Sequence, residues 1–371
     1  MNKNNTVLRN SYINTIKISA LTFFFAVSFM LTACNNGNID IPNEEYASIA
    51  TTVPMIPTET TVVPLPTPTT TALGSIAEPV PMTWPNPNIP FLWHVTSPSG
   101  QTMYMFGTIH YGIRDFFPLP QELMQAFGRS DYLAVEVPLF IEREWSNPAT
   151  VMAITELDDY TEKFNELRSQ AINLLAGYES RLLGRGITVD ELYGLSIDVL
   201  SWLVRNIAST IAGTSTTNGM EVFFYERAMI RQMPVLYIEC PAAIDERMQG
   251  ASLTLNIRQL EISIERGISE HAETIVEYLH YWRNNDGQAL LNTFIPLALT
   301  DLGDDELIAE MEYILYISRH PRMLESARQF MEDGKKVFFM VGATHLLLEG
   351  GLIDQLVELG YTVERIEWNG W

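Results

Sequence analysis

Two copies of one short pattern, an apolar run that ends in Gly-x-x-His, constrain the fold of this chain more than any other feature. The first copy covers Met105–His110 and the second covers Met340–His345. A buried strand that ends in glycine and small residues places the following imidazole at the carboxyl edge of a sheet, where open α/β sheets collect ligands. Because both copies have this form, we expect the two ends of the domain to meet in one sheet.

The segments around these patterns indicate an α/β fold. Apolar and aromatic runs at 91–95 and 103–107 flank the turn sequence 97–100, which predicts a β-hairpin. A strand follows at 132–137, and the chain closes with a strand, a helix and a strand after Lys336. Between about 161 and 331 apolar residues recur with a helical period, interrupted by a strand at 234–239. We predict a central mixed β-sheet formed by the N- and C-terminal segments, with a large helical insertion between Val137 and Lys336.

The N-terminal region has the order of a bacterial secretory signal. Residues 1–33 contain cations without acids, then an apolar run, then small residues directly before Cys34. This order predicts a lipoprotein signal peptide, with Cys34 as the lipid anchor. Residues 34–90 are rich in Thr and Pro, which is typical of a disordered tether. We expect residues 91–371 to form the α/β domain of an extracytoplasmic protein that is lipid-anchored to the bacterial cell membrane.

The charge of the chain argues against nucleic acid as a partner. The sequence has 23 Lys and Arg residues against 45 Asp and Glu residues, for a formal net charge of -22. Phosphate backbones are bound by clustered cations, and the sequence contains no such cluster. We therefore expect no nucleic-acid binding, and attachment to the membrane through the lipid anchor.

His110, Glu136 and His345 are the first candidates for chemistry, because each lies in or directly after a predicted strand. Two neutral imidazoles and a carboxylate suit a divalent transition metal such as Mn, Co, Fe or Zn, which would activate water. The same groups would work without metal if a histidine were a general base and the carboxylate oriented it. Spacing does not decide between these mechanisms, since the groups come from separate strands.

Glu239 and Arg319 are candidates of second rank. Glu239 ends an apolar strand, where an acid needs a cation, a metal or hydrogen bonds. Arg319 carries a planar fork that suits a substrate carboxylate. A salt bridge at the sheet edge and a charge on a helix surface are the alternatives. The remaining histidines are interpreted as surface or packing residues: His94, His271, His280 and His320.

The motifs taken in order resemble the TraB/GumN family, which is related to Tiki-type proteases. The matching segments are Gly107–His110, Leu119-Pro120, Glu136, Gly219-Met220-Glu221, Ile238-Glu239, Trp282–Asp286, Arg319, Val341–His345, Gly350–Leu352 and Gly360–Val363. The resemblance implies a metal-dependent protease acting on a peptide or protein substrate, with His110, His345 and Glu136 in its active site.

This chain departs from the family pattern at Glu221, where an aspartate is expected, and at His320, where asparagine is expected after the arginine. Our leading prediction is a membrane-anchored, metal-dependent peptidase. Two alternative hypotheses of function stay open. One is a metal-free hydrolase similar to the erythromycin esterases, and the other is a non-catalytic lipoprotein that captures a peptide or haem through the same histidines.

Overall fold

A computed structural model describes residues 91–138, 161–184, 186–240 and 250–367 of the chain. The predicted signal peptide, Cys34 and the tether at 34–90 lie outside these residues. None of the helices in the described ranges is long and apolar enough to cross a membrane.

A six-stranded sheet forms the centre of the fold, with the strand order β4-β3-β5-β2-β1-β6. The strands are β1 (Leu92–Thr96), β2 (Thr102–Thr108), β3 (Tyr132–Val135), β4 (Val235–Tyr237), β5 (Val337–Gly342) and β6 (Thr362–Arg365). Strands β4, β3, β5 and β2 are parallel, whereas β1 runs antiparallel to both β2 and β6. The predicted mixed sheet of N- and C-terminal segments is thus confirmed, and β4 from the insertion adds one edge strand.

The predicted hairpin is also confirmed. Strands β1 and β2 pair from Leu92 opposite Phe106 to Thr96 opposite Thr102. The turn between them closes with a hydrogen bond from Ser97 N to the carbonyl oxygen of Gln101, 2.8 Å long. This hairpin places β2 beside β5, with Gly107 opposite Val341, so the two Gly-x-x-His patterns end side by side.

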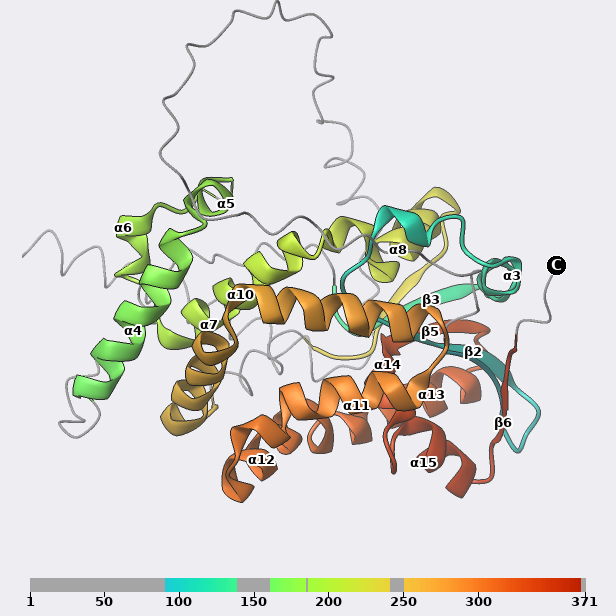
Figure 1. Cartoon of the computed structure of the whole chain (residues 1–371). Helices are drawn as coiled ribbons and strands as arrows, with labels where there is room; N and C mark the ends of the chain where they lie inside the picture. The colour runs from blue at the N-terminus through green and yellow to red at the C-terminus, as the bar shows by residue number, and fades with distance from the viewer. Residues whose placement is uncertain (1–90, 139–160, 185, 241–249, 368–371) are drawn as a thin grey trace, which may run out of the picture. The chain divides into compact units, whose positions relative to one another are not determined.

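Helices cover both faces of the sheet, which explains the almost continuous apolar sequence of β5. Five of its six residues are buried, as expected for a parallel strand covered on both sides. Figure 1 shows α3 (Gln121–Gly128) and α8 (Met220–Ile230) on one face, and α13 (His320–Glu332) and α15 (Leu352–Glu358) on the other. The aromatic rings of Phe106, Phe224 and Phe338 meet in the core, with centroids 4.9–5.8 Å apart.

The long helix α10 (Leu253–Arg283) joins the sheet to the helical part of the insertion. Its first half packs with α4 (Thr161–Ala176) and α7 (Ile197–Ile211) in a second apolar cluster. At its other end Trp282 is buried in the core of the sheet and donates a hydrogen bond from Nε1 to the carbonyl oxygen of Gly107, 2.9 Å away. The helix kinks at Gly267, where φ is 66°. The hydrogen bond from Trp282 to Gly107 anchors the end of β2, just before His110.

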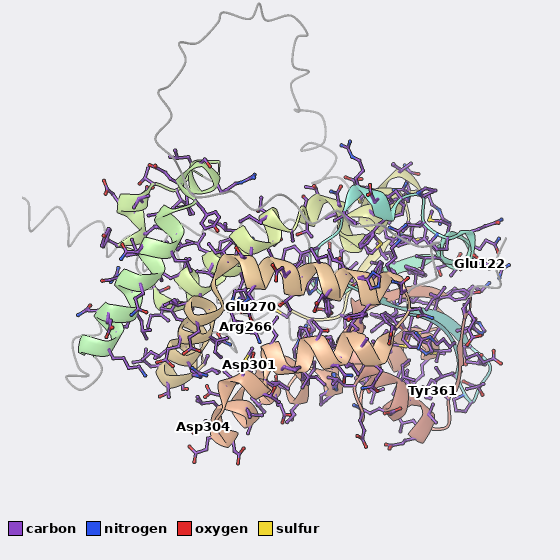
Figure 2. The ribbon with its side chains drawn as sticks, in the orientation of Figure 1. Glu122, Arg266, Glu270, Asp301, Asp304 and Tyr361 are labelled. Atoms are coloured by element: carbon purple, nitrogen blue, oxygen red, sulfur yellow. The ribbon has the colours of Figure 1, made fainter. Side chains whose placement is uncertain are left out.

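Polar contacts connect α10, close to its kink, with segments that follow it in the chain (Figure 2). Arg266 on α10 pairs with Glu270 one turn later, at 3.5 Å, and with Asp301 from the turn η4 (Thr300–Leu302). Asp304 caps α12 (Asp305–Glu312) by accepting a hydrogen bond from Glu306 N, 2.9 Å long. These contacts join η4 to α10 and cap the start of α12.

Candidate active site

The predicted site residues of the sheet lie at one edge, where the parallel strands end. Glu136 directly follows β3, and Glu239 lies just beyond β4. The chain keeps these two residues paired past the strand ends, because Glu239 N donates a hydrogen bond to the carbonyl oxygen of Glu136 at 2.7 Å. His110 follows β2, and His345 lies in the short helix α14 (Ala343–Leu347) directly after β5. Parallel strands bring these side chains together because their carboxyl ends share an edge.

Arg319 joins the two acids of the edge. It lies at the start of α13, and its Nη2 donates to Glu136 Oε2 at 2.8 Å and to Glu239 Oε2 at 2.5 Å. Its Nε also donates to Glu239 Oε2, at 2.8 Å. All three side chains are buried: the exposed fraction is 12% for Glu136, 1% for Glu239 and 13% for Arg319. The second-rank candidates Glu239 and Arg319 therefore form a buried ion-pair cluster with Glu136, with Arg319 between the two acids.

The environment keeps Glu136 ionised. Burial acts to raise the pKa of its carboxyl, but interactions with His345 and with the charge of Arg319 outweigh burial and lower the pKa to about 2. The backbone N–H of Gly342 also donates to Glu136 Oε1, at 2.5 Å. The carboxylate thus has a cation on one oxygen and a backbone donor on the other.

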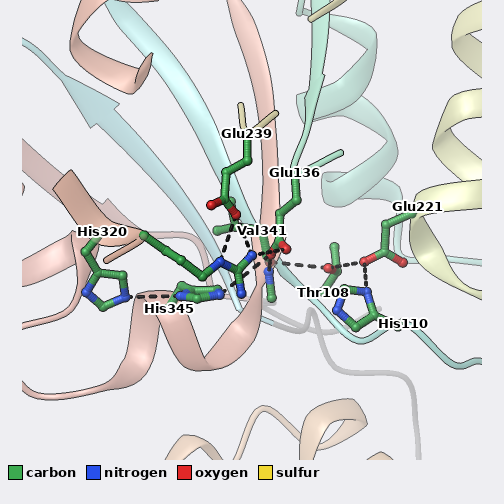
Figure 3. Close-up of polar contacts among 10 residues, drawn as sticks. Thr108, His110, Glu136, Glu221, Glu239, His320, Val341 and His345 are labelled. Atoms are coloured by element: carbon green, nitrogen blue, oxygen red, sulfur yellow. Dashed lines mark hydrogen bonds and ion pairs between the residues drawn. The ribbon is translucent and has the colours of Figure 1, made fainter. Parts of the chain in front are cut away.

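His345 is buried beside this carboxylate, with 4% of the residue exposed. Its Nε2 lies 3.9 Å from Glu136 Oε1, and its Nδ1 lies 3.1 Å from Nε2 of His320 (Figure 3). Burial lowers the pKa of His345 to about 3, although Glu136 acts to raise it, and burial lowers the pKa of His320 to about 4. Both imidazoles are therefore neutral at neutral pH. The sequence-based interpretation of His320 as a surface or packing residue missed its contact with this histidine.

His110 occupies a different environment on the other side of Glu136 (Figure 3). Its Nδ1 lies 3.2 Å from Glu221 Oε1, and 65% of its side chain is exposed. Desolvation acts to lower the pKa of His110, but the hydrogen bond and charge of Glu221, together with Glu136, raise it to about 9. The carboxylate of Glu221 therefore favours the protonated form of His110, and water screens part of this interaction at the exposed ring. His110 is a titrating imidazole with a carboxylate behind it.

Glu221 was not predicted as a site residue, because it neither lies in nor follows a predicted strand. It lies in the first turn of α8 and is 9% exposed. Its Oε1 also accepts a hydrogen bond from the hydroxyl of Thr108, 2.5 Å long, and Thr108 ends β2. The acid is therefore held against the strand that carries His110. The available signal was the family motif Gly219-Met220-Glu221, in which this residue replaces an aspartate.

The glycines of the two motifs have different roles. A Cβ atom at Gly107 would lie 3.0 Å from Ala343 Cα and 3.0 Å from Phe91 Cβ. A side chain there would push β2 away from α14. At Gly342 the nearest atoms would be Glu136 Oε1 at 3.4 Å and a ring carbon of His345 at 3.5 Å, which are ordinary contacts. Close approach of the backbone therefore explains Gly107, whereas Gly342 contributes its N–H to Glu136.

The arrangement of donors does not fit the expected metal ion. Across the residues with described positions, no three His, Cys, Asp or Glu side chains are grouped so that they would hold a metal. Glu136 is already engaged by Arg319 and by Gly342 N, and His110 Nδ1 is engaged by Glu221. The divalent metal stays a prediction.

Fold and site together define an α/β protein with a charged, histidine-containing site at the carboxyl edge of a mixed sheet. The family model described as the TraB/PrgY/gumN family matches residues 91–365. The chain belongs to this family, which confirms the resemblance predicted from its motifs. No curated protein and no solved structure matches the chain.

Proposed function

We propose that this protein is a hydrolase of peptide bonds in which His110 is the general base and Glu221 orients it. The observation that carries the proposal is the contact of His110 Nδ1 with Glu221, 3.2 Å long, on a ring that is largely exposed. The contact engages Nδ1, so Nε2 is the ring nitrogen that would act on water or substrate. A histidine oriented by a carboxylate is a common arrangement for proton transfer in hydrolysis.

In the proposed reaction His110 Nε2 takes a proton from a water molecule as the water oxygen bonds to the carbonyl carbon. Glu221 stabilises the imidazolium that forms. The same proton then passes to the amide nitrogen as the carbon–nitrogen bond breaks, so that an acid and an amine are released and His110 is neutral again. Positioned proton transfer of this kind contributes about 10²–10⁴-fold to a rate.

The buried cluster has an electrostatic role in this proposal. Arg319 and the two acids it binds form a rigid charged edge close to the reacting groups. Such pre-arranged charges need no reorientation as charge develops during the reaction. We place peptides ahead of other substrates because the family resemblance implies proteolysis, and a metal-free esterase reaction would use the same histidine and acid.

The test is hydrolysis of a mixed peptide library by the purified full chain, read by mass spectrometry. We expect cleavage by the parent protein and a loss on the order of 10²-fold or more in His110→Gln. His280→Gln, a change on the exposed face of α10, is the matched control and should retain the parent rate. Unchanged cleavage by His110→Gln would refute the proposal.

Metal analysis decides the remaining alternatives. Stoichiometric Mn, Co, Fe or Zn in the parent protein, with activity abolished by a chelator, would establish the metal-dependent peptidase. Activity that survives chelation in metal-free protein would support the metal-free hydrolase. Stoichiometric binding of a peptide or haem without turnover would support the binding protein instead.

We also propose that Cys34 carries the lipid and that the protein is attached to the outer side of the bacterial cell membrane. The support is the order of charge, apolar run and small residues before Cys34. In bacteria supplied with labelled palmitate, we expect the label on the parent protein and none on Cys34→Ser. Equal labelling of both proteins would exclude this anchor.

A further inference from the structure

His320 and His345 form a contact that the proposed reaction does not use. Their facing nitrogens, His320 Nε2 and His345 Nδ1, are 3.1 Å apart, and their rings are inclined at 72°. Both residues are buried, with 8% and 4% exposed. A nitrogen pair at this distance is a hydrogen bond, in which one nitrogen carries the proton and the other accepts it.

The local fold restricts how these rings can move. A π-helical turn, η5 (Tyr313–Ile317), precedes Arg319 and His320. The ring of Tyr316, from this turn, packs against both imidazoles, with centroids 5.7 Å from His320 and 5.4 Å from His345. Neighbouring residues therefore contact different parts of the site, because Arg319 binds Glu136 and Glu239 while His320 binds His345. Single π-helical turns are frequent at functional sites.

The charge of Glu136, on the other side of His345, favours one of the two possible tautomers of this ring. Glu136 Oε1 lies 3.9 Å from His345 Nε2. This is too long for a direct hydrogen bond, but in a buried setting the charge acts strongly over that distance. An Nε2 lone pair would face the negative oxygen and be repelled, whereas an Nε2–H would be attracted. With the proton on Nε2, Nδ1 is an acceptor, and His320 must supply the donor.

From this geometry we infer that His320 is a positioning residue that donates to His345 Nδ1 and holds His345 as a fixed Nε2–H donor facing Glu136. Both histidines are then Nε2–H tautomers. The two Gly-x-x-His motifs consequently do different work. His110 exchanges protons at an exposed position, whereas His345 presents a permanent N–H group to the site.

The inference on the tautomer does not depend on catalysis, although its value for the reaction rests on the proposed function. It is tested by long-range proton–nitrogen correlation NMR of the full chain labelled with ¹⁵N in its histidine rings. The chain contains six histidines, and His320→Gln and His345→Gln assign the two signals of interest. We expect His320 and His345 each to show a protonated Nε2 and an unprotonated Nδ1. An unprotonated Nε2 on His345 would overturn the inference, whether or not the protein hydrolyses peptides.

Two substitutions separate hydrogen bonding from packing. Glutamine places an amide N–H where His320 has its Nε2–H, so His320→Gln should keep the His345 tautomer and a rate within about threefold of the parent. Leucine fills the space without a hydrogen-bond donor, so His320→Leu should lower kcat on the order of 10-fold or more. Removing a residue that hydrogen-bonds to a functional histidine and orients it has an effect of this size. Equal activity of the leucine and glutamine variants would show that His320 serves packing alone.

Near-UV circular dichroism should confirm that both variants are folded. If the leucine variant does not fold, the NMR spectrum of the parent protein still decides the tautomer. A parent spectrum with both Nε2 atoms protonated supports the inference, and any other pattern for His345 contradicts it.

Discussion

Arg319 binds Glu136 and Glu239 at the same time, with Nη2 at 2.8 Å from the first carboxylate and 2.5 Å from the second. These acids follow different strands, so one side chain from α13 ties the ends of β3 and β4 together. Because two buried carboxylates share this one cation, loss of the arginine would leave both charges uncompensated.

We predict that Arg319→Met lowers the free energy of unfolding by about 3–5 kcal/mol, the usual effect of removing one partner from a buried ion pair. Urea unfolding measures this change. The control is Arg328→Met on the same helix, where the arginine is 39% exposed and pairs with exposed acids. Its loss should be below about 1 kcal/mol. Equal losses in the two variants would show that burial of the Arg319 cluster adds no stability.

A second prediction concerns the pH dependence of hydrolysis. The general base must be neutral, and Glu221 raises the pKa of His110 toward 9 from an ordinary value of 6.5. The rate constant kcat/KM should therefore rise with pH through this range. In Glu221→Gln the rising limb should move to lower pH, because the carboxylate that favours the imidazolium is gone, and the plateau should fall. Glu226→Gln, an exposed change on the same helix, should leave the limb in place. A limb unchanged in Glu221→Gln would remove this acid from the mechanism.

The third prediction concerns stability in acid. Burial lowers the pKa of His345 from 6.5 to about 3 and that of His320 to about 4. The unfolded chain thus binds protons at these two residues before the folded chain does, so their contribution to stability is complete above pH 6.5 and is lost toward pH 4. The raised pKa of His110 acts in the opposite direction, but between pH 6.5 and pH 9. The lowered pKa of Glu136 acts in the same direction below pH 4.5.

This acid dependence is measured by urea unfolding between pH 6.5 and pH 4, where His110 is protonated in both the folded and the unfolded chain. His320→Gln removes one titrating group, so its stability should fall less steeply with acidification than that of the parent. If the parent protein kept constant stability across this range, the two histidines would not be buried in the neutral form.

The fourth prediction concerns the end of β2. Gly107→Ala places a methyl group 3.0 Å from the backbone of Ala343 and from Phe91 Cβ, and should cost about 1–3 kcal/mol of stability, as overpacking does. Gly128→Ala in α3, where nothing lies within 4 Å of the added atom, should be neutral or stabilising by up to about 1 kcal/mol. Thermal unfolding of the two variants compares them directly. A Gly107→Ala protein as stable as the parent would mean that β2 and α14 adjust without cost.

Sequence patterns predicted the sheet and the four site residues that follow its strands. Apolar runs with short turns indicated all six strands, and His110, Glu136, Glu239 and His345 were singled out because they end or follow such runs. These inferences succeeded because the position of a side chain at a strand end depends on local sequence, and parallel strands bring their ends to one edge.

The partners of those residues were decided by the tertiary structure. Glu221 and His320 lie on helices far along the chain, and their sequence context resembles that of ordinary helix surface or core residues. The docking of α8 against β3 and of α13 against β5 brings one to His110 and the other to His345. Sequence alone determined which groups stand at the edge of the sheet. Helix packing decided which of them titrates and which stays neutral, because burial and neighbouring charge arise from contacts between distant segments.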